Sequence, residues 1–285
     1  MTLLDWQRFI EDALGKAGFE NAAQEAKWLL AGALGQENAY VILNPTVVPT
    51  PDEEVIIQEW LRRRLKKEPL SRIKGMREFW SLPFQLNAAT LDPRPETETI
   101  VEGVLKWVGP QKNKPWRILD LGTGSGCLLI SLLHELPSAV GVGVDLQPEA
   151  LEMAQSNAAL NGVETRASFS QGNWGENLEG SFDIIVSNPP YISLSEEETL
   201  EDGVRLFDPS LALFGGEDGL ACYRALAESI PPLLSPDGVV FLEIGQGQRP
   251  TVEALFHAAG FQTLTILSDL AGIERTLSLA RHPFA

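Results

Sequence analysis

The sequence predicts an α/β protein in which a mainly parallel sheet, covered by helices on both faces, follows a small all-helical domain. Apolar residues recur at helical spacing before residue 75, whereas short apolar runs alternate with helical patterns after residue 97. Strand–helix units of this length are typical of a parallel sheet. We therefore expect an N-terminal helical domain (1–75), a β-hairpin linker (76–92) and a larger α/β domain (93–285).

The N-terminal domain is predicted from amphipathic spacing. The apolar residues assigned to its first helix are Leu4, Phe9, Ile10, Ala13 and Leu14. A second helix is expected over residues 22–30. A third follows a proline-rich stretch, with Asp52 placed to cap its N-terminus.

The linker and the α/β domain follow in order along the chain. Near-alternation of apolar and aromatic residues over 76–92 predicts a β-hairpin. The strands expected after it are 116–121, 139–146, 165–171, 182–187, 239–244, 261–268 and 276–281. The helices expected around them are 97–108, 127–135, 148–160, 219–234 and 251–259.

Composition excludes several classes of protein. The chain has 285 residues, of which 44% are hydrophobic and 21% charged, as in ordinary globular proteins. No apolar run approaches the ~20 residues that span a bilayer, and the N-terminus lacks the pattern of a secretion signal. With only two cysteines, Cys127 and Cys222, a disulfide scaffold or a cysteine-ligated zinc site is not expected. These features favour a cytoplasmic protein that does not associate with membranes.

The charge is acidic overall but uneven. A net charge of −17 argues against direct binding of duplex DNA, because cationic side chains supply most of that affinity. The segment Leu61–Arg77 is nevertheless strongly basic. It is interpreted either as a solvated helix face or as a docking patch for an acidic or RNA-associated partner. The acidic segment Ser193–Asp202 is a solvated loop or a lid over a substrate.

A glycine-rich loop, Gly122-Thr123-Gly124-Ser125-Gly126, follows the first strand of the predicted sheet and opens into a helix. Glycines at such a turn let the backbone approach a ligand at the helix N-terminus. The spacing is G-x-G-x-G and not the G-x-G-x-x-G of dinucleotide binders, and no Walker lysine follows it. Asp145 ends the next strand, where a carboxylate can accept hydrogen bonds from both ribose hydroxyls of an adenosine. The alternative for Asp145 is an N-cap of the helix that begins at Pro148.

Asn188-Pro189-Pro190-Tyr191 ends the apolar strand Phe182–Ser187. Proline lacks an N–H, fixes φ and favours an extended residue before it, so the tetrapeptide is a stiff turn. Such a turn holds the Asn188 carboxamide and nearby carbonyls as acceptors that suit a substrate with an NH2 group. The plainer alternative for Asn188 is a strand-end turn without chemistry.

The glycine loop, Asp145 and the tetrapeptide together resemble the class I S-adenosylmethionine-dependent methyltransferases that act on amino groups. Longer segments are similar to the release factor glutamine N5-methyltransferases, which are protein-(glutamine-N5) methyltransferases. Those segments are Gly75–Phe84, Pro93–Glu98, Phe182–Tyr191, Gly215–Leu220 and Asp269–Arg275. The tetrapeptide alone is shared with DNA adenine methyltransferases, and the other segments are more specific.

The resemblance implies a Rossmann-like methyltransferase domain with a seven-stranded sheet, S-adenosyl-L-methionine as cofactor and S-adenosyl-L-homocysteine as its product. It assigns Gly122, Thr123, Gly124, Ser125, Gly126, Asp145 and Asn188 to the cofactor. It also places Trp174 as a wall of the adenine site, whereas the alternative for Trp174 is ordinary packing. It implies class I peptide chain release factors as the protein substrate and a helical domain that recognises them. We also expect a monomer, and no metal site is expected because no metal-ligand spacing recurs in the sequence.

The same resemblance places catalysis and substrate binding in Asn188, Pro189, Pro190 and Tyr191. The Asn188 side-chain oxygen and the Pro189 carbonyl would each accept one N–H of the target amide, which aims the nitrogen lone pair at the methyl group. Tyr191 would form an apolar wall for the aliphatic part of the target side chain or lie near the sulfonium. Glu243 and Gln246 border this site or, more simply, end their strand.

Two alternative functions remain open at this point. One is adenine-N6 methylation of DNA or RNA, in which Tyr191 would stack on a flipped base. The other is a non-catalytic module that binds a protein partner.

Overall fold

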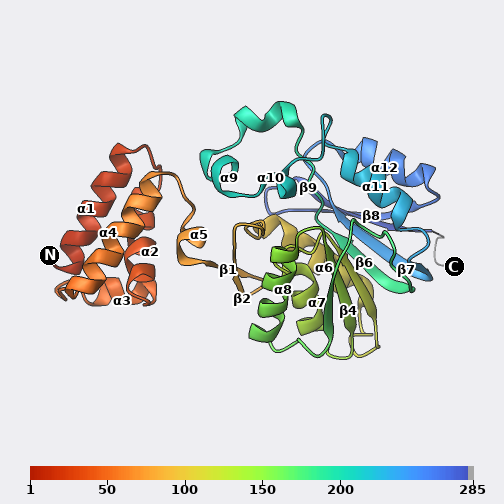
Figure 1. Ribbon diagram of the computed structural model, residues 1–285, viewed down its shortest axis with the longest axis horizontal. Coiled ribbons are helices and arrows are strands. Elements are labelled where there is room, and N and C mark those ends of the chain that lie inside the picture. The colour runs from red at the N-terminus through yellow and green to blue at the C-terminus, as the bar shows by residue number, and fades with distance from the viewer. Residues whose placement is uncertain (282–285) are drawn as a thin grey trace. The chain divides into compact units, whose positions relative to one another are not determined.

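The computed structural model describes residues 1–281, which form two units (Figure 1). The helical unit comprises Met1–Gly75 together with Glu201–Phe207, and the sheet unit comprises Met76–Leu200 with Asp208 onward. The chain therefore enters the helical unit twice, an excursion that no sequence pattern indicates. Within residues 1–281, no helix combines the length and apolar composition needed to cross a bilayer.

The helical unit is built on its own apolar core. Its helices are α1 (Leu3–Lys16), α2 (Ala22–Ala33), α3 (Asn38–Leu43), α4 (Pro51–Leu65), α5 (Leu70–Lys74) and α9 (Asp202–Phe207). The buried face of α1 consists of Leu3, Trp6, Ile10 and Leu14. Ile10 and Leu14 are thus placed as expected, but Leu4 and Phe9 lie 38% and 51% exposed. The phase of the helix explains this, because Leu3 and Trp6 share the face of Ile10 and Leu14.

The start of α4 differs from the expectation for Asp52. Thr50 is the N-cap: its hydroxyl accepts a hydrogen bond from the Glu53 N–H, and the Glu53 carboxylate accepts one from the Thr50 N–H. Pro51 occupies the first helical position, where a missing N–H costs nothing. Asp52 therefore lies inside the first turn and only complements the positive end of the helix dipole.

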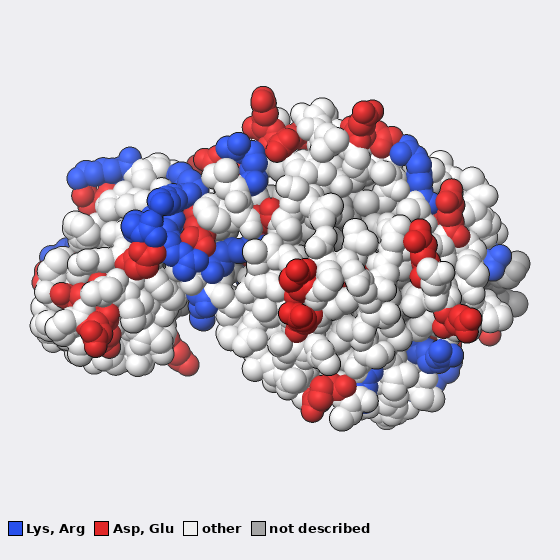
Figure 2. All heavy atoms as spheres, in the orientation of Figure 1, with Lys and Arg blue, Asp and Glu red and all other residues white. Residues whose placement is uncertain are grey.

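The basic segment Leu61–Arg77 is largely neutralised by neighbouring acids. The three consecutive arginines pair as Arg62 with Glu59, Arg63 with Glu68 and Arg64 with Glu25. Figure 2 shows basic side chains gathered on the helical unit with acidic ones among them. Lys66 and Lys74 are exposed, so they contribute more of the free positive charge of this segment than the arginines do.

The sheet unit contains a seven-stranded sheet in the order β5-β4-β3-β6-β7-β9-β8. Its strands are β3 (Arg117–Leu121), β4 (Val140–Asp145), β5 (Ala167–Gln171), β6 (Phe182–Ser187), β7 (Leu234–Glu243), β8 (Gln262–Ser268) and β9 (Glu274–Ala280). The pairs from β5 to β7 are parallel, and β9 is antiparallel to both β7 and β8. The predicted α/β fold with a mainly parallel seven-stranded sheet is confirmed.

Helices cover both faces of this sheet (Figure 1). The helices of this unit are α6 (Glu98–Val108), α7 (Cys127–Glu135), α8 (Pro148–Leu160), α10 (Ser210–Leu213), α11 (Ala221–Ser229) and α12 (Arg249–Ala258), with 3-10 turns η1 (Pro95–Thr97) and η2 (Leu194–Thr199). Side chains of β6 alternate between the two cores: Ile184 and Val186 pack with α6 and α7, whereas Ile185 packs with α11 and α12. A strand buried on both sides needs an apolar residue at nearly every position, which explains the continuous run that predicted β6.

The segment before β7 was predicted incorrectly. A helix was expected through residue 234, but α11 ends at Ser229 and β7 begins at Leu234. Pro231 and Pro232 follow the helix and cannot donate to its last carbonyls, so the chain turns there.

The predicted hairpin is present, and it is short. Strands β1 (Met76–Phe79) and β2 (Leu82–Gln85) pair antiparallel around Trp80 and Ser81, both of which have positive φ. A two-residue turn of this kind matches the twist of its strands. Phe79 and Phe84 are buried in the core beneath α6 and α7, so the hairpin packs on the sheet unit.

The sheet topology brings the two predicted motifs together. Strands β3 and β6 are parallel neighbours in which Asp120 is paired with Val186. The glycine loop after β3 and the tetrapeptide after β6 therefore leave the sheet at the same edge. The Ser187 hydroxyl donates to the Leu121 carbonyl at 2.6 Å and ties the two strand ends. Ligands of parallel α/β sheets bind at the carboxyl ends of the strands, beside the point where the strand order reverses. Here that point is at β3, which has β4 on one side and β6 on the other.

Candidate active site

A cavity of about 850 Å³ lies at the carboxyl ends of β3, β4 and β6. Its lining includes the sequence-predicted residues Gly122, Thr123, Gly124, Ser125, Asp145, Trp174, Asn188 and Pro190. Gly126, Pro189 and Tyr191 border these residues in the chain without lining the cavity. The volume is in the range of pockets that enclose a small organic ligand.

The glycine loop has a conformation that only glycine adopts readily. Gly122, Gly124 and Gly126 have φ of 75°, 54° and 81°, which explains the G-x-G-x-G spacing. The N–H groups of Gly122 and Thr123 both donate to the Val144 carbonyl, which holds the loop against β4. A Cβ on Gly126 would lie 2.8 Å from Ile130 Cδ1 and 3.2 Å from Ala154 Cβ, so this glycine allows α7 and α8 to pack closely.

Asp145 holds the loop from the next strand. One carboxylate oxygen accepts the Gly124 N–H at 2.8 Å, and the other accepts the Gln147 N–H at 3.0 Å. The N-cap of α8 is Gln147, so the alternative that Asp145 caps this helix is wrong. Each carboxylate oxygen has two lone pairs. After these two hydrogen bonds, Asp145 can therefore still accept hydrogen bonds from a ligand in the cavity that it lines.

Trp174 lies over the first glycine of the loop. Its ring comes within 3.4 Å of the position that a Cβ on Gly122 would take, and the side chain lines the cavity. The residue has a φ of 54°, which is uncommon for a side chain of this size. The ring also packs against the core on one side of the sheet. Trp174 therefore packs against the core, as the alternative expected, and its side chain also lines the cavity.

The tetrapeptide is held by glycines and by one glutamine. A Cβ on Gly215 would lie 2.6 Å from the Pro190 carbonyl oxygen, and a Cβ on Gly219 would lie 2.4 Å from that of Tyr191. The Gln248 side chain donates to the same Tyr191 carbonyl at 2.9 Å. Residues larger than glycine at 215 or 219 would push the turn out of place, which gives the segment Gly215–Leu220 a structural role.

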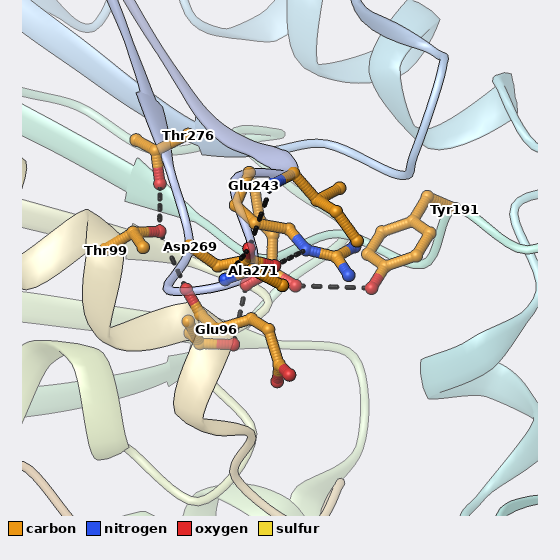
Figure 3. Close-up of polar contacts among 10 residues, drawn as sticks. Glu96, Thr99, Tyr191, Glu243, Asp269, Ala271 and Thr276 are labelled. Atoms are coloured by element: carbon orange, nitrogen blue, oxygen red, sulfur yellow. Dashed lines mark hydrogen bonds and ion pairs between the residues drawn. The ribbon is translucent and has the colours of Figure 1, made fainter.

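The side chains of Asn188 and Tyr191 both connect to a buried carboxylate, that of Glu243, and Figure 3 shows the Tyr191 hydroxyl directed at it. Asn188 Nδ2 donates to Thr97 Oγ1 at 3.1 Å, and Thr97 Oγ1 donates to Glu243 Oε2 at 2.6 Å. The Tyr191 hydroxyl donates to Glu243 Oε1 at 3.3 Å. The simpler interpretation, that Glu243 only ends its strand, is therefore wrong. The available signal for Glu243 was a carboxylate at the end of the strand beside β6. Thr97 lies in the segment Pro93–Glu98 that carries the family resemblance, but no pattern there indicated its contact with Asn188.

Burial shifts the acidity of Glu243 and of the tyrosine bonded to it. Glu243 is 2% exposed, and desolvation raises the pKa of its carboxyl to about 7. Hydrogen bonds from Thr97 and Tyr191 and the charge of Arg275 lower this pKa, but by less than desolvation raises it. Desolvation and the Glu243 charge raise the pKa of Tyr191. The tyrosine is consequently a neutral hydrogen-bond donor near neutral pH.

Other groups of the site were not anticipated. Arg94 lines the cavity and pairs with the buried Asp208 at 2.6 Å. Asn157 is fully buried; its side chain donates to the Ser125 and Gln85 carbonyls and accepts the Gln85 N–H, which joins the hairpin to the glycine loop. These contacts span distant parts of the sequence and leave no local pattern.

The cysteines do not have the character of nucleophiles. Burial raises the pKa of Cys127 to about 12 and that of Cys222 to about 11, so both remain thiols near neutral pH. Among residues 1–281, no cluster of three or more His, Cys, Asp or Glu side chains could hold a metal ion.

Asp120 lies behind the glycine loop. One of its oxygens accepts the Thr123 hydroxyl at 2.7 Å. Burial raises the pKa of this carboxyl from 3.8 to about 7, and hydrogen bonds from the Thr123 hydroxyl and the Leu129 backbone offset this only in part. The folded state thus holds a proton that the unfolded chain releases at lower pH.

We expect Asp120→Asn to stabilise the protein at high pH more than at low pH. Because the folded pKa is raised, wild-type stability falls as pH rises from about 4 to about 7. The side-chain amide of an asparagine at position 120 does not titrate, and its oxygen can still accept the hydrogen bond from the Thr123 hydroxyl. Urea unfolding at about pH 5 and about pH 8 checks this. A stability difference between variant and wild type that is the same at both pH values would contradict it.

Known proteins resemble both parts of the chain. A family model described as a methyltransferase domain matches residues 112–244, and one described as the PrmC N-terminal domain matches residues 5–75. The release factor glutamine methyltransferase of Rhodospirillum rubrum is 46% identical over 269 residues, which cover 93% of this chain and 81% of the relative. The protein of the same name from Caulobacter vibrioides is 39% identical, covering 99% of this chain and 98% of the relative.

A solved structure supports the fold from a greater distance. A methyltransferase from Pyrococcus furiosus aligns with a TM-score of 0.53 at 17% identity, over 77% of this chain and 98% of that one. This likeness shows the α/β fold alone.

Proposed function

This chain belongs to the release factor glutamine methyltransferase family, and we propose that it methylates the side-chain amide nitrogen (N5) of a glutamine in peptide chain release factors. The methyl donor is S-adenosyl-L-methionine, and the target is the glutamine of the Gly-Gly-Gln motif. The observation that carries the proposal is the amide of Asn188, which lines the cavity while its Nδ2 is held by Thr97. Its oxygen remains as an acceptor for a substrate NH2.

The residues of the cavity fit the donor. Asp145 has acceptor capacity for the ribose hydroxyls, and Trp174 offers a ring face beside Gly122 for the adenine. Asp120 is buried behind the same loop and does not line the cavity; by accepting the Thr123 hydroxyl it supports the loop and does not contact the donor. S-adenosylmethionine supplies an electrophilic methyl group on a sulfonium when bound.

The role of the protein in the reaction is to orient the target amide. An amide nitrogen is a poor nucleophile because its lone pair is delocalised into the carbonyl. Asn188 Oδ1 and the Pro189 carbonyl oxygen would each accept one N–H of the target, which directs the lone pair toward the cavity. The same two dipoles stabilise the positive charge that develops on nitrogen, and the proton leaves to water afterwards. Tyr191, neutral and held by Glu243, would flank the aliphatic part of the glutamine.

The test is methyl transfer to three substrates side by side: a purified release factor, its Gly-Gly-Gln glutamine→alanine variant, and an adenine-containing oligonucleotide. We expect transfer to the first alone. Transfer to the oligonucleotide would favour an adenine-N6 methyltransferase, against which the net charge of −17 already counts. Failure to bind S-adenosylmethionine would favour a non-catalytic binding module.

We propose that the helical domain, residues 1–75, recognises the body of the release factor and that its free lysines contribute. Reversing the charges of Lys66 and Lys74 is expected to raise KM for the full-length factor several-fold at low salt and to leave transfer to a short Gly-Gly-Gln peptide unchanged. Arg64 is unsuitable as a probe, because its ion pair with Glu25 and its position over Phe19 make it structural. Equal effects on peptide and full-length factor would contradict the proposal.

We further infer a cytoplasmic monomer that binds neither DNA nor a membrane. The free cysteines support a reducing compartment such as the cytoplasm, and the acidic charge counts against binding of DNA. Light scattering during size-exclusion chromatography would expose a stable dimer.

A further inference from the structure

One buried carboxylate, that of Glu243, connects to both ends of the tetrapeptide. Its Oε2 accepts the Thr97 hydroxyl, which in turn accepts Asn188 Nδ2. Its Oε1 accepts the Tyr191 hydroxyl (Figure 3). Thr97 ends η1, just before α6, and Glu243 ends β7. The turn η1, the strand β7 and the tetrapeptide after β6 thus meet at the Glu243 carboxylate.

While Glu243 is ionised, the order of donors and acceptors in this chain is forced. A threonine hydroxyl has one proton, and an ionised carboxylate has none. The Thr97 proton is therefore committed to Glu243 at 2.6 Å, and Thr97 can only accept from Asn188. The NH2 end of the Asn188 amide satisfies this requirement, whereas its oxygen does not. The two ends of an amide are nearly identical in shape, so the hydrogen-bond network decides between them.

We propose that Glu243 and Thr97 are positioning residues that fix the Asn188 amide with Oδ1, and not NH2, facing the substrate. This inference rests on the proposed function and deepens it. If the amide were reversed, Nδ2 would meet the N–H groups of the target glutamine. Two donors would then face each other at the reacting nitrogen. Neither Thr97 nor Glu243 needs to touch the substrate for this role.

The ionisation of Glu243 connects this arrangement to pH. A protonated Glu243 could donate to Thr97, and the Thr97 proton could then turn toward Asn188, which would permit the reversed amide. Burial raises the pKa of Glu243 to about 7, so the protonated form is populated just below neutral pH. The charged or titratable groups that act on Glu243 or on its tyrosine partner are Glu96, Arg94, Tyr191, Tyr223, Cys127 and Arg275. Arg275 itself pairs with Asp269 at 2.9 Å.

The test compares three threonine variants in steady-state transfer to a release factor. Thr97→Val removes both hydrogen bonds at nearly constant shape, and Thr97→Ser keeps the hydroxyl. Thr99→Val is the matched control, because Thr99 is also buried and its hydroxyl binds Glu96 and Thr276, not the tetrapeptide. We expect kcat to fall roughly ten- to a hundredfold in Thr97→Val. The KM values and the affinity for S-adenosylmethionine should stay near wild type.

Rescue and pH dependence complete the test. Thr97→Ser and Thr99→Val should retain most of kcat. Wild-type kcat should fall as pH drops below about 7. Glu243→Gln should lower kcat and remove this fall, because the glutamine side chain does not titrate. Near-normal kcat in Thr97→Val, equal losses in Thr97→Val and Thr99→Val, or no rescue by serine would overturn the inference. Wild-type transfer to the release factor in the same assay keeps the proposed function independent of this result.

Discussion

Asn188→Ala is expected to lower methyl transfer to the release factor by roughly a hundred- to a thousandfold, the loss seen when a transition-state hydrogen-bonding group is removed. Asn188 presents the acceptor that orients the target amide, and alanine leaves the nitrogen lone pair undirected. The loss should appear in kcat. Affinity for S-adenosylmethionine should change little, because the glycine loop and Asp145 do not depend on Asn188 for their hydrogen bonds.

Two measurements separate this role from a structural one. Isothermal titration with S-adenosylmethionine reports the cofactor site, and a tritiated-methyl assay reports transfer. Asn113→Ala removes an exposed asparagine and serves as the control for the substitution itself. Near-normal transfer by Asn188→Ala would exclude the assigned role, and loss of cofactor binding together with transfer would reassign Asn188 to the cofactor site.

Asp145→Ala is expected to do the opposite: to weaken S-adenosylmethionine binding by roughly ten- to a hundredfold while kcat at saturating cofactor stays near wild type. The carboxylate would accept the ribose hydroxyls, and hydrogen bonds to a charged group contribute about 1.5–3 kcal/mol. Its loss also frees the Gly124 N–H, which Asp145 holds at 2.8 Å. Both effects act on binding before the chemical step.

Asp183→Ala is the matched control for this prediction. Asp183 also accepts a backbone N–H, that of Arg117, but it lies at the start of β6, the opposite edge of the sheet from the cavity. Isothermal titration should show normal cofactor affinity for Asp183→Ala and weak binding for Asp145→Ala. Equal affinity in the two variants would mean that Asp145 supports the loop without contacting the cofactor.

The fold could be predicted because its signals are local. The apolar runs of β3 and β6, the glycine loop and the prolines of the tetrapeptide each occupy a few consecutive residues. The parallel pairing of β3 with β6 then brings Gly122 and Asn188 to one edge. Errors in single positions arose where two nearby residues could take the same role. For example, Thr50 and Asp52 are both suitable N-cap residues, and Thr50 is the one that caps α4.

The support behind the site could not be predicted, because its members are distant in sequence. Thr97 and Glu243 are 146 residues apart and meet only because β7 lies beside β6 and η1 ends next to both. Neither residue type is unusual where it stands. The same holds for Asn157, which reaches the glycine loop and the hairpin from α8.

The orientation of the target amide is the central claim, and a crystal structure with S-adenosyl-L-homocysteine and a Gly-Gly-Gln peptide tests it most directly. The expected result places the glutamine nitrogen about 2.7–3.2 Å from both Asn188 Oδ1 and the Pro189 carbonyl oxygen, with Asn188 Nδ2 still on Thr97. A glutamine nitrogen bonded to other groups, or an Asn188 amide turned so that Nδ2 faces the peptide, would contradict it.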